Sequence, residues 1–496
     1  MDQTIVIRKA DWIIGWDIAL GGHTYLRGGD VAFRGDRIVQ VGGHFEGVAD
    51  REIVGAGKCV MPGLVDLHSH PYSEPMNKGF ATAEVAGQNG ERLWVNDLIV
   101  FRKSDDDRRK SAAVAYAEML ASGVTTAVDI SYPYEGWVEL AASSGLRVCL
   151  APAFAGGNWE QDDAFGVRYA WKEDDGRAAY AASVAVIDAA LAEASGRLSG
   201  MMMPAQVDTC SEALLRDSWQ AAQERGLRWQ THAAQLVTEF QEITRRHGMT
   251  PIRWLNSIGV LAPGSILAHC ILLDHHSQMR SWGTRGELEL LAETGTAVAH
   301  CPTIFARQSG LALEDFGRYR GLGIPVGIGT DTFPHNMLEE MRLAMLIARV
   351  TSARVDGASI ADVFNAATID GAKALGRDDI GRIAVGAKAD IVLLNLDHPS
   401  MLPLSDPLTS LLHQAADRAV HDVFVDGRQV VAAGQVLTID LPEATRALGL
   451  ARETMARRAV ENDRKRRTLD EIAPLPLPVR SHVTKAVAED RQRQPH

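Results

Sequence analysis

The chain has 496 residues, of which 46% are hydrophobic and 23% charged, so it is long enough for a large core and a second, smaller domain. Its formal net charge of −12 argues against nucleic acid or an anionic membrane as the main partner and favours a neutral or cationic small-molecule substrate. Five scattered cysteines, mostly within apolar runs, are typical of a reducing compartment. No run of 18 apolar residues and no secretion signal is evident, so we expect a cytoplasmic protein.

Short apolar segments separated by polar, glycine-rich turns define the order of the elements. Residues 1–59 contain several strand-like runs and predict the first part of a small β-sandwich. Across residues 60–378, apolar strands alternate with helical segments, and eight such strands are the number that closes a (β/α)8 barrel. Residues 379–440 return to short strands that can complete the sandwich. The chain therefore predicts an α/β fold, a TIM-type barrel with a composite β-sandwich formed by the N- and C-terminal segments.

Two segments fall outside this pattern. The segment from Ala155 to Gly176 is too polar and glycine-rich for a core element, and it is either an insertion that covers the substrate or an inert surface loop. Residues 441–496 combine a charged amphipathic helix with a Pro-rich polar tail, a composition typical of a partly disordered arm or of a segment that wraps around another subunit. We therefore expect a homodimer or a larger homo-oligomer.

The segment VMPGLVDLHSHP, from Val60 to Pro71, contains the strongest local signal for chemistry. Its apolar, β-branched run predicts a buried strand that ends in His68 and His70. Because side chains alternate along a strand, both imidazoles point to the same side, roughly 6.5 to 7 Å apart at the backbone, and can converge on one metal ion. From this segment alone, two histidines in an ordinary loop are an equal alternative.

Further ionisable side chains stand at the carboxyl ends of predicted barrel strands, where the loops of this architecture build active sites. They are His232 in RWQTHAA, His269 in SILAHC, His300 in TAVAHCP and Asp331 in VGIGTD. A single strand histidine is more often structural. Several ionisable groups buried together, however, cost free energy unless a ligand or partner compensates them. The set therefore indicates a functional site at this end of the barrel.

The ordered set HSH, H, H and GTD, together with the blocks PGLVDLHSH and IGRIAVGAKADIVLLNL, resembles the amidohydrolase superfamily over about residues 5–440. Within it, the chain is similar to the branch of the triazine hydrolases, the cytosine and guanine deaminases and S-adenosylhomocysteine deaminase. The resemblance implies a barrel hydrolase that uses a divalent metal ion on a small-molecule substrate. It is specific for the fold and the metal chemistry and says little about the substrate.

Transferred position by position, the resemblance implies that His68, His70, His232 and Asp331 are ligands of one divalent metal ion. His269 then stands beside the metal-bound water and polarises the bond under attack, while Asp331 passes the proton of that water to the leaving group. Relatives with two metals bridge them with a carboxylated lysine on the fourth strand. The corresponding segment here, GMMMPAQV, contains no lysine, so one metal per chain is expected. Three imidazoles and a carboxylate favour Zn²⁺, with Fe²⁺, Mn²⁺ or Co²⁺ as alternatives.

The sequence departs from the family pattern three residues after His232. Deaminases of this branch usually read H-x-x-E there, with the glutamate protonating a ring nitrogen, but this chain has Gln235. Glutamine can donate a hydrogen bond through its NH₂ group but cannot deliver a proton. Glu239, one helical turn further on, is either a substitute acid or a solvated helix residue, and we favour the second interpretation.

Side chains in loops near the expected barrel mouth are candidates for substrate contact. In HCPTIFARQSG, Phe305 can stack on a ring, and Arg307 and Gln308 can bind a polar group of the substrate. Alternatively, Phe305 is a packing residue and the other two belong to a surface turn. The full predicted set comprises Trp94, His300, Phe305, Arg307, Gln308 and His335.

The combined pattern predicts a hydrolase that acts on a carbon–nitrogen bond, other than a peptide bond, of a small cyclic or aryl-bearing nitrogen compound. Gln235 favours an amide, urea or carbamate, because His269 and a metal can polarise its carbonyl without protonating a ring. The predicted catalytic residues are His269, Asp331 and Gln235. One alternative is a hydrolytic deaminase or chlorohydrolase of a heteroaromatic ring such as a triazine, purine, pterin or pyrimidine. Another is a non-catalytic metal-binding relative.

Overall fold

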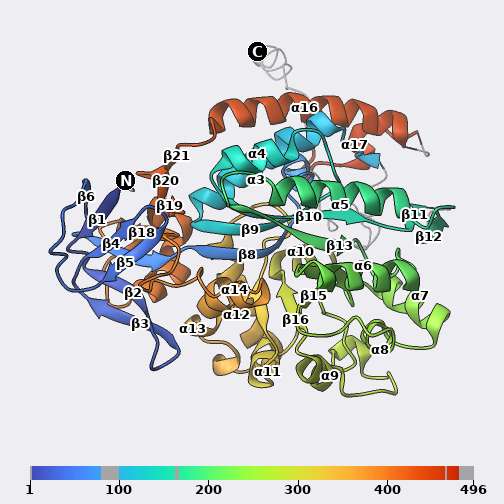
Figure 1. Cartoon of the computed structure of the whole chain (residues 1–496). Helices are drawn as coiled ribbons and strands as arrows, with labels where there is room; N and C mark the ends of the chain where they lie inside the picture. Colours follow the sequence, from blue (N-terminus) through green and yellow to red (C-terminus); the bar gives the residue numbers. More distant parts are fainter. Residues whose placement is uncertain (1–2, 80–99, 162–166, 464–465, 480–496) are drawn as a thin grey trace, which may run out of the picture.

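The computed structural model describes residues 3–79, 100–161, 167–463 and 466–479, and its centre is a barrel of eight parallel strands. The strands lie in the order β17-β16-β15-β14-β13-β10-β9-β8 and alternate with helices along the chain, which confirms the predicted barrel (Figure 1). The strands are β8 (Leu64–Ser69), β9 (Val124–Ser131), β10 (Arg147–Phe154), β13 (Leu198–Pro204), β14 (Arg228–Ala233), β15 (Ser265–His269), β16 (Ala297–His300) and β17 (Val326–Ile328).

The segment after the last strand meets the first strand through backbone hydrogen bonds that also position the site. Asp331 N donates to His68 O at 2.8 Å, and His70 N donates to Asp331 O at 2.9 Å. The Asp66 carboxylate supports this closure by accepting hydrogen bonds from Thr330 N at 3.0 Å and from Thr330 Oγ1 at 2.6 Å. The two ends of the barrel sheet are thereby joined, and three of the predicted metal ligands lie at the junction.

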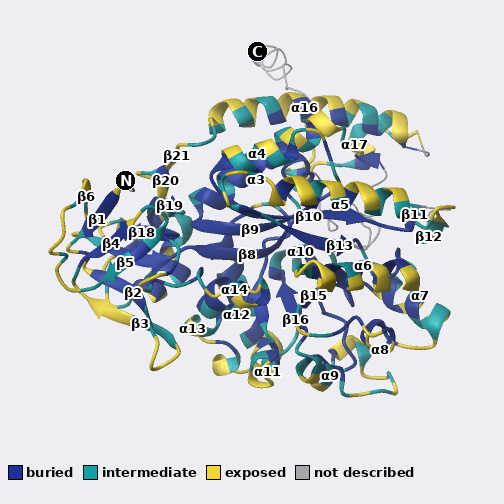
Figure 2. Cartoon of the chain, in the orientation of Figure 1, coloured by how far each residue is buried: buried dark blue, intermediate teal, exposed yellow. Residues whose placement is uncertain are grey.

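Helices surround the barrel, and the strands between them are buried along nearly their whole length (Figure 2). Gly200 on β13 shows how close this packing is, because a Cβ atom there would lie 2.5 Å from Ile187 Cγ2 on helix α5. The helices are α3 (Asp105–Ala121), α4 (Trp137–Ser144), α5 (Arg177–Leu191), α6 (Glu212–Glu224), α7 (Val237–His247), α8 (Pro251–Ser257), α9 (Glu287–Thr294), α10 (Pro302–Ser309), α11 (Phe316–Gly321), α12 (Met337–Ser352), α13 (Ile360–Asn365) and α14 (Gly371–Ala374).

The N- and C-terminal segments form two further sheets over a shared apolar core. Phe33 and Phe424 meet edge to face in this core, with ring centroids 5.4 Å apart, and Ile7, Val60 and Leu393 are buried beside them. One sheet contains β1 (Thr4–Arg8), β4 (Val31–Arg34), β5 (Arg37–Val41) and β6 (Arg51–Val54). The other contains β2 (Trp12–Asp17), β3 (Gly22–Arg27), β7 (Lys58–Pro62), β18 (Ile391–Asn395), β19 (Val420–Val425), β20 (Arg428–Ala432) and β21 (Gln435–Val436).

The C-terminal part of the chain returns to the barrel as a long helix. Helix α16 (Leu441–Asn462) packs Leu448 and Met455 against Val114 of α3, and α17 (Leu469–Ile472) follows it. The predicted amphipathic helix is therefore present. No helix among the described residues is long and apolar enough to cross a membrane.

The segment expected to form one strand from Val60 to Leu67 is divided at Gly63. Residues up to Pro62 pair with β18 in the terminal sheet, and β8 begins only at Leu64. Gly63 N donates to Asp390 O at 3.0 Å, and a Cβ atom on Gly63 would lie 2.0 Å from Thr125 Oγ1. The single-strand expectation is wrong because the chain changes sheets at this glycine.

Replacing Gly63 by alanine is expected to lower the free energy of unfolding by about 1–3 kcal/mol, because Thr125 and its strand must move to admit the methyl group. Thermal and chemical denaturation measure the effect. Gly449→Ala is the matched control, since nothing lies within 4 Å of its added Cβ and alanine favours helix α16. Equal stability of Gly63→Ala and the parent chain would contradict the close approach described here.

Candidate metal and active site

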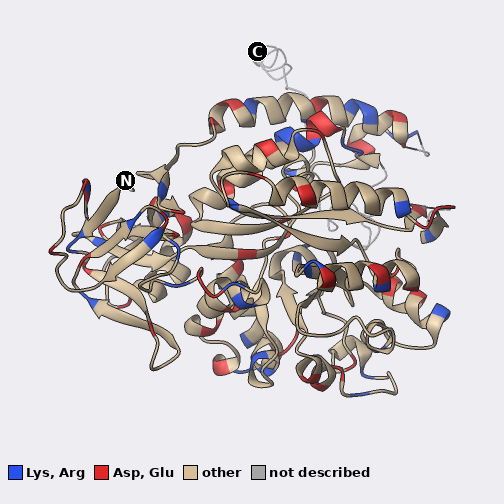
Figure 3. Cartoon of the chain, viewed as in Figure 1, with Lys and Arg blue, Asp and Glu red and all other residues tan. Residues whose placement is uncertain are grey.

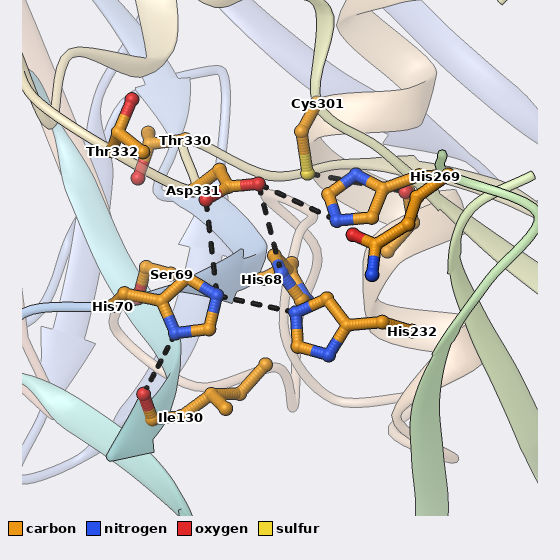
Figure 4. A network of polar contacts seen from close by, with 12 residues as sticks. His68, Ser69, His70, Ile130, His232, His269, Cys301, Thr330, Asp331 and Thr332 are labelled. Carbon is orange, nitrogen blue, oxygen red and sulfur yellow. Dashed lines mark hydrogen bonds and ion pairs between the residues drawn. The ribbon is translucent and has the colours of Figure 1, made fainter. Parts of the chain in front are cut away.

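Four histidines and one aspartate converge at the carboxyl end of the barrel (Figure 4). His68 and His70 come from the end of β8, His232 from β14, His269 from β15, and Asp331 from the segment after β17. The His68 ring centroid lies 4.9 Å from that of His70, 4.8 Å from that of His232 and 5.1 Å from that of His269. The structure therefore brings together the residues that the sequence predicted as metal ligands and as the catalytic histidine.

Each of the three predicted histidine ligands has its Nδ1 atom held by an acceptor. His70 Nδ1 lies 3.0 Å from Ile130 O, and His232 Nδ1 lies 2.5 Å from Ala205 O. His68 Nδ1 lies 2.5 Å from the side-chain oxygen of a buried glutamine, Gln230. Because a carbonyl oxygen only accepts, these contacts place the proton on Nδ1 and leave a lone pair on Nε2. This arrangement is typical of histidines that bind a metal through Nε2.

The three Nε2 atoms face one another. His70 Nε2 and His232 Nε2 are 3.2 Å apart, and the buried His68 Nε2 has no hydrogen-bond partner among the described residues. Two acceptor atoms at this distance repel each other unless a cation or a proton lies between them. The three residues form a group whose ligand atoms all lie within 4.8 Å of one another. The donor set and its orphaned nitrogen therefore fit a divalent metal ion.

Asp331 completes the cluster and faces His269. Its carboxylate oxygens lie 3.8 Å from His68 Nε2 and 3.8 Å from His70 Nε2. Asp331 Oδ2 also lies 3.5 Å from His269 Nε2, which is a third contact of the same carboxylate. The Asp331 carboxylate can thus contribute a ligand oxygen to the three-histidine cluster while one of its oxygens stays close to His269.

Burial controls the charge of these groups. It lowers the pKa of His232 to about 3 and holds the pKa values of His68, His70 and His269 below their ordinary value, so the imidazoles are neutral at pH 7. Burial, followed by the charge of nearby acidic groups, raises the pKa of Asp331 well above its ordinary value. Neutral imidazoles are the form that binds metals, and a cation is what compensates a buried carboxylate.

A second group of ligand atoms overlaps the first. His68, Asp331 and the buried thiol of Cys301 lie within 4.8 Å of one another. Burial raises the pKa of that thiol well above its ordinary value, so the thiolate is disfavoured. The three-histidine group is therefore the better-matched site, because its donor atoms are already in the deprotonated form.

The backbone at the site is strained. His269, Cys270, Ala234 and Asp331 adopt positive φ angles of 77°, 47°, 55° and 56°, respectively. Residues other than glycine rarely adopt this left-handed region, and such conformations concentrate at functional sites. The strain turns the strand ends so that His269 and Asp331 face the cluster.

A pocket opens beside the cluster and is lined by residues that the sequence did not single out. Glu74, Tyr72, Tyr132 and Gln206 line it together with the predicted Gln235. Glu74 and Asp331 are the carboxylates among the described pocket-lining residues. Glu74 follows the last histidine of HSH by four residues, in HSHPYSE, and this closeness is the feature of the sequence that could have indicated it. No local pattern shows that its side chain lines the pocket.

Gln235 lies in the pocket as a hydrogen-bonding group. Its Nε2 donates to Gln206 Oε1 at 3.0 Å, and its buried Oε1 has no hydrogen-bond partner among the described residues. The side chain thus presents a free acceptor. A buried acceptor without a partner costs free energy, which a donor group of the substrate can remove.

Glu239 is neither solvated nor in the pocket. It is fully buried, and its carboxylate accepts hydrogen bonds from Ala234 N at 2.6 Å and Gln235 N at 3.0 Å. The solvated-helix interpretation is therefore wrong. Glu239 is placed to hold the backbone of the β14–α7 turn and, through it, the side chain of Gln235.

The predicted insertion from Ala155 to Gly176 contains an antiparallel hairpin, β11 (Gly157–Gln161) and β12 (Val167–Trp171). Trp159 Nε1 and Tyr169 OH donate to the buried carboxylate of Asp208 at 2.8 Å and 2.6 Å. The two strands of this hairpin are therefore held in place by hydrogen bonds to Asp208.

The predicted substrate contacts divide into two groups. Phe305 and Gln308 line the pocket, and the Phe305 ring meets His269 edge to face with centroids 4.7 Å apart. Arg307 instead donates to Phe333 O at 3.0 Å and lies outside the pocket lining. His300 and His335 are also buried outside it, with His335 Nδ1 2.9 Å from Thr330 Oγ1, so substrate contact by these three residues lacks support. Trp94 lies outside the described residues.

Comparison with known proteins identifies the family. The model of the amidohydrolase family matches residues 59–430, which is most of the chain, and the chain therefore belongs to that family. It is a hydrolase of carbon–nitrogen bonds, as the sequence predicted, and the non-catalytic alternative is not supported.

Relatives of known activity align over nearly their whole length. A 5'-deoxyadenosine deaminase from Methanothermobacter thermautotrophicus is 29% identical over 84% of this chain and 92% of its own. A 5-methylthioadenosine/S-adenosylhomocysteine deaminase from Halobacterium salinarum is 30% identical over 83% of this chain and 89% of its own.

Solved structures share the fold at lower identity. An adenosine deaminase from Xanthomonas campestris with bound zinc superposes with a TM-score of 0.75 at 21% identity, covering 92% of this chain and 98% of its own. An atrazine chlorohydrolase from Arthrobacter aurescens, also complexed with zinc, gives a TM-score of 0.74 at 23% identity over 90% and 100% of the two chains.

The predicted roles of His232 as a metal ligand and of His269 as a catalytic residue lead to different expectations for their alanine variants. His232→Ala is expected to lose most of the bound metal, because it removes one of the facing Nε2 atoms. His269→Ala is expected to keep its metal and to lower turnover by roughly 10²–10³, because it removes a group that acts mainly in the transition state. Elemental analysis and steady-state kinetics measure the two effects.

His44→Ala provides the control, since the His44 side chain is 67% exposed and lies in the segment between β5 and β6, away from the barrel site, and it is expected to change neither quantity. If His269→Ala loses its metal as completely as His232→Ala does, His269 is a ligand and its assignment here fails.

Proposed function

We propose that this chain is a metal-dependent deaminase that hydrolyses the exocyclic carbon–nitrogen bond of an amino-substituted nitrogen heterocycle, with adenosine derivatives as the first class to examine. The observation that carries the proposal is the cluster of facing Nε2 atoms with Asp331 and His269 beside it. The named activities of the aligned relatives support the choice of ring deamination, which the sequence had left as the alternative.

We infer one metal ion per chain, most simply Zn²⁺, held by the three Nε2 atoms and by a carboxylate oxygen of Asp331. Strand β13 carries three consecutive methionines, Met201 to Met203, where a bridging lysine would be needed for a second ion. A bound divalent ion supplies Lewis acidity and lowers the pKa of a water molecule to near neutrality.

Asp331 and His269 provide the proton transfer and the polarisation. A carboxylate beside the attacking water can take its proton and return it to the leaving amine. His269, whose Nε2 lies 3.5 Å from Asp331 Oδ2, is placed to interact with charge that develops at the carbon under attack. Phe305 covers one edge of His269 and excludes water from that side.

Deamination of a ring also needs a proton on a ring nitrogen, and Gln235 cannot supply it. Glu74 lines the same pocket and is the further carboxyl group there among the described residues. We therefore assign the role of ring acid to Glu74. Gln235, held by Gln206, contributes a hydrogen bond that orients the heterocycle.

A second candidate is hydrolysis of a cyclic amide, urea or carbamate. The unpartnered Oε1 of Gln235 favours it, because such substrates present an N–H group beside the carbonyl under attack. Ammonia release from purine nucleosides, pterins, pyrimidines and aminotriazines, compared with ring opening of cyclic amides and ureas, separates the two candidates. Activity confined to the second set would replace the deaminase proposal.

Glu74→Gln is expected to lower ammonia release by roughly 10²–10⁴, the usual contribution of general-acid catalysis, while the metal content stays unchanged. Glu453→Gln on the exposed face of α16 is the matched control and is expected to behave as the parent enzyme. Undiminished turnover of Glu74→Gln would remove Glu74 from the mechanism.

Gln235→Glu is expected to be neutral or harmful on all ring substrates. It places a further carboxylate in the pocket that already holds Glu74 and Asp331, and repulsion between like charges disfavours the ionised form of the introduced side chain. Initial rates of ammonia release across pH provide the measurement. A gain of 10² or more would show that position 235 is the natural place of the acid and that Glu74 does not fill the role.

The domain boundaries at residues 59, 378 and 440, the homo-oligomeric state and the cytoplasmic location stay predictions from the sequence.

A further inference from the structure

A second cavity lies at the opposite end of the barrel from the metal cluster. It has a volume of about 320 Å³ and is lined by residues from the amino-terminal ends of β9, β10, β13 and β14, together with the ends of α5, α6 and α14. The lining residues are Thr126, Arg147, Cys149, Leu191, Ser199, Gly200, Arg225, Gly226, Leu227, Arg228, Leu375, Arg377 and Ile380. They include four arginines and no carboxylate among the described residues.

Three of the four arginines have acidic partners outside the cavity. Arg225 pairs with Asp188, and Arg377 Nε lies 2.7 Å from Asp379 Oδ1. Arg147, which is 2% exposed, donates through Nε and Nη2 to Asp390 and Asp426. Its Nη1 atom is buried without a hydrogen-bond partner among the described residues.

Arg228 has no ion pair in the part of the chain that the structure describes. Burial alone lowers the pKa of its guanidinium from the ordinary value, with no acidic neighbour to raise it. Its side chain lies between two glycines, because a Cβ atom would meet Nη2 at 2.1 Å if added to Gly376 and Nη1 at 3.0 Å if added to Gly264. The cavity therefore holds a positioned positive charge with which no carboxylate of the described residues pairs.

A hydroxyl group lies on the strand next to Arg147, because Thr126 on β9 is paired with Arg147 on β10. Thr126 is 3% exposed, and its Oγ1 has no hydrogen-bond partner among the described residues. Charged residues lie mainly on the helices and connecting segments of the molecule, whereas the barrel strands carry few of them (Figure 3). Arginines at two strand ends, Arg147 and Arg228, are thus a local departure from the rest of the barrel, and Arg228 is the one without a carboxylate partner among the described residues.

We propose that this cavity binds a phosphate-bearing small molecule, with the phosphate at Arg147 Nη1, Arg228 and Thr126 Oγ1 and the remaining atoms against the apolar side chains. Guanidinium and hydroxyl donors are the groups that recognise phosphate, and here Arg147 Nη1, Arg228 and Thr126 Oγ1 stay unengaged by the described residues although Asp390 and Asp426 hold the other nitrogens of Arg147. The volume exceeds that of one phosphate ion, and Leu227, Leu375 and Ile380 offer apolar contact for an attached group. The site is separate from the reaction centre, so the inference does not depend on the proposed function.

Isothermal titration calorimetry of the metal-loaded full chain with phenyl phosphate, and with inorganic phosphate, tests the proposal. Saturable binding is expected, with phenyl phosphate the tighter of the two. Arg228→Gln is expected to weaken binding about ten-fold or more, because it removes a charge-assisted contact, and to leave metal content and turnover unchanged. Arg228→Lys, which keeps the charge, is expected to retain part of the affinity.

Two further variants keep the test decisive. Thr126→Val is nearly isosteric, retains every charge, and is expected to weaken binding several-fold even if Arg228→Gln fails to fold. Arg216→Gln on α6, whose parent side chain is 58% exposed and pairs with Glu212, is the control and is expected to bind as the parent does. Absence of saturable binding, or binding that Arg228→Gln and Thr126→Val leave unchanged because the phosphate sits at the metal, would overturn the proposal.

Discussion

His70 Nε2 and His232 Nε2 lie 3.2 Å apart, and both Nδ1 atoms are engaged by carbonyl oxygens, so the two lone pairs point at each other across the site. Two lone pairs facing each other in a buried site are unfavourable unless a cation lies between them. The orphaned His68 Nε2 and the buried carboxylate of Asp331 add to the same requirement. The site is thus built for a metal ion before any substrate is considered, and the barrel supplies the rigidity that holds these groups together.

That rigidity arises where the barrel closes. Asp331 and the HSH segment exchange backbone hydrogen bonds, so a proposed metal ligand from each end of the sheet is fixed by the same contacts that complete the fold. Gly63 lets the chain leave the terminal sheet and enter β8 within one residue, which ties the position of His68 to the packing of the sandwich. Opposite the site, Arg147 joins the barrel to Asp390 and Asp426 of the terminal segments. Stability and ligand placement therefore rely on the same junctions.

Strand periodicity predicted the eight strands, and ionisable residues at strand ends predicted a functional site there. The assignment of four of these residues as metal ligands came from the resemblance to the amidohydrolase superfamily. The sequence could not predict which loop side chains turn into the pocket, since that depends on rotamers and tertiary packing. Arg307 donates to Phe333 O, and His335 contacts Thr330, so neither side chain lines the pocket. Glu74 and Gln206 do line it, although they come from segments without a distinctive motif. The position of Glu239 on a helix predicts a solvent-exposed side chain. In the structure its carboxylate instead accepts hydrogen bonds from two backbone N–H groups of the turn before α7, a contact that helical position alone does not reveal.

X-ray absorption spectroscopy of the zinc-loaded protein reports the atoms bound to the metal and so tests whether the three facing histidines hold it. We expect a single zinc environment of nitrogen and oxygen atoms at about 2.0–2.1 Å, with the multiple-scattering signature of three imidazoles. Cys301 lies close enough to His68 and Asp331 to offer an alternative ligand. A zinc–sulfur distance of about 2.3 Å, or fewer than three imidazoles, would contradict the assignment of the three facing histidines as the metal site.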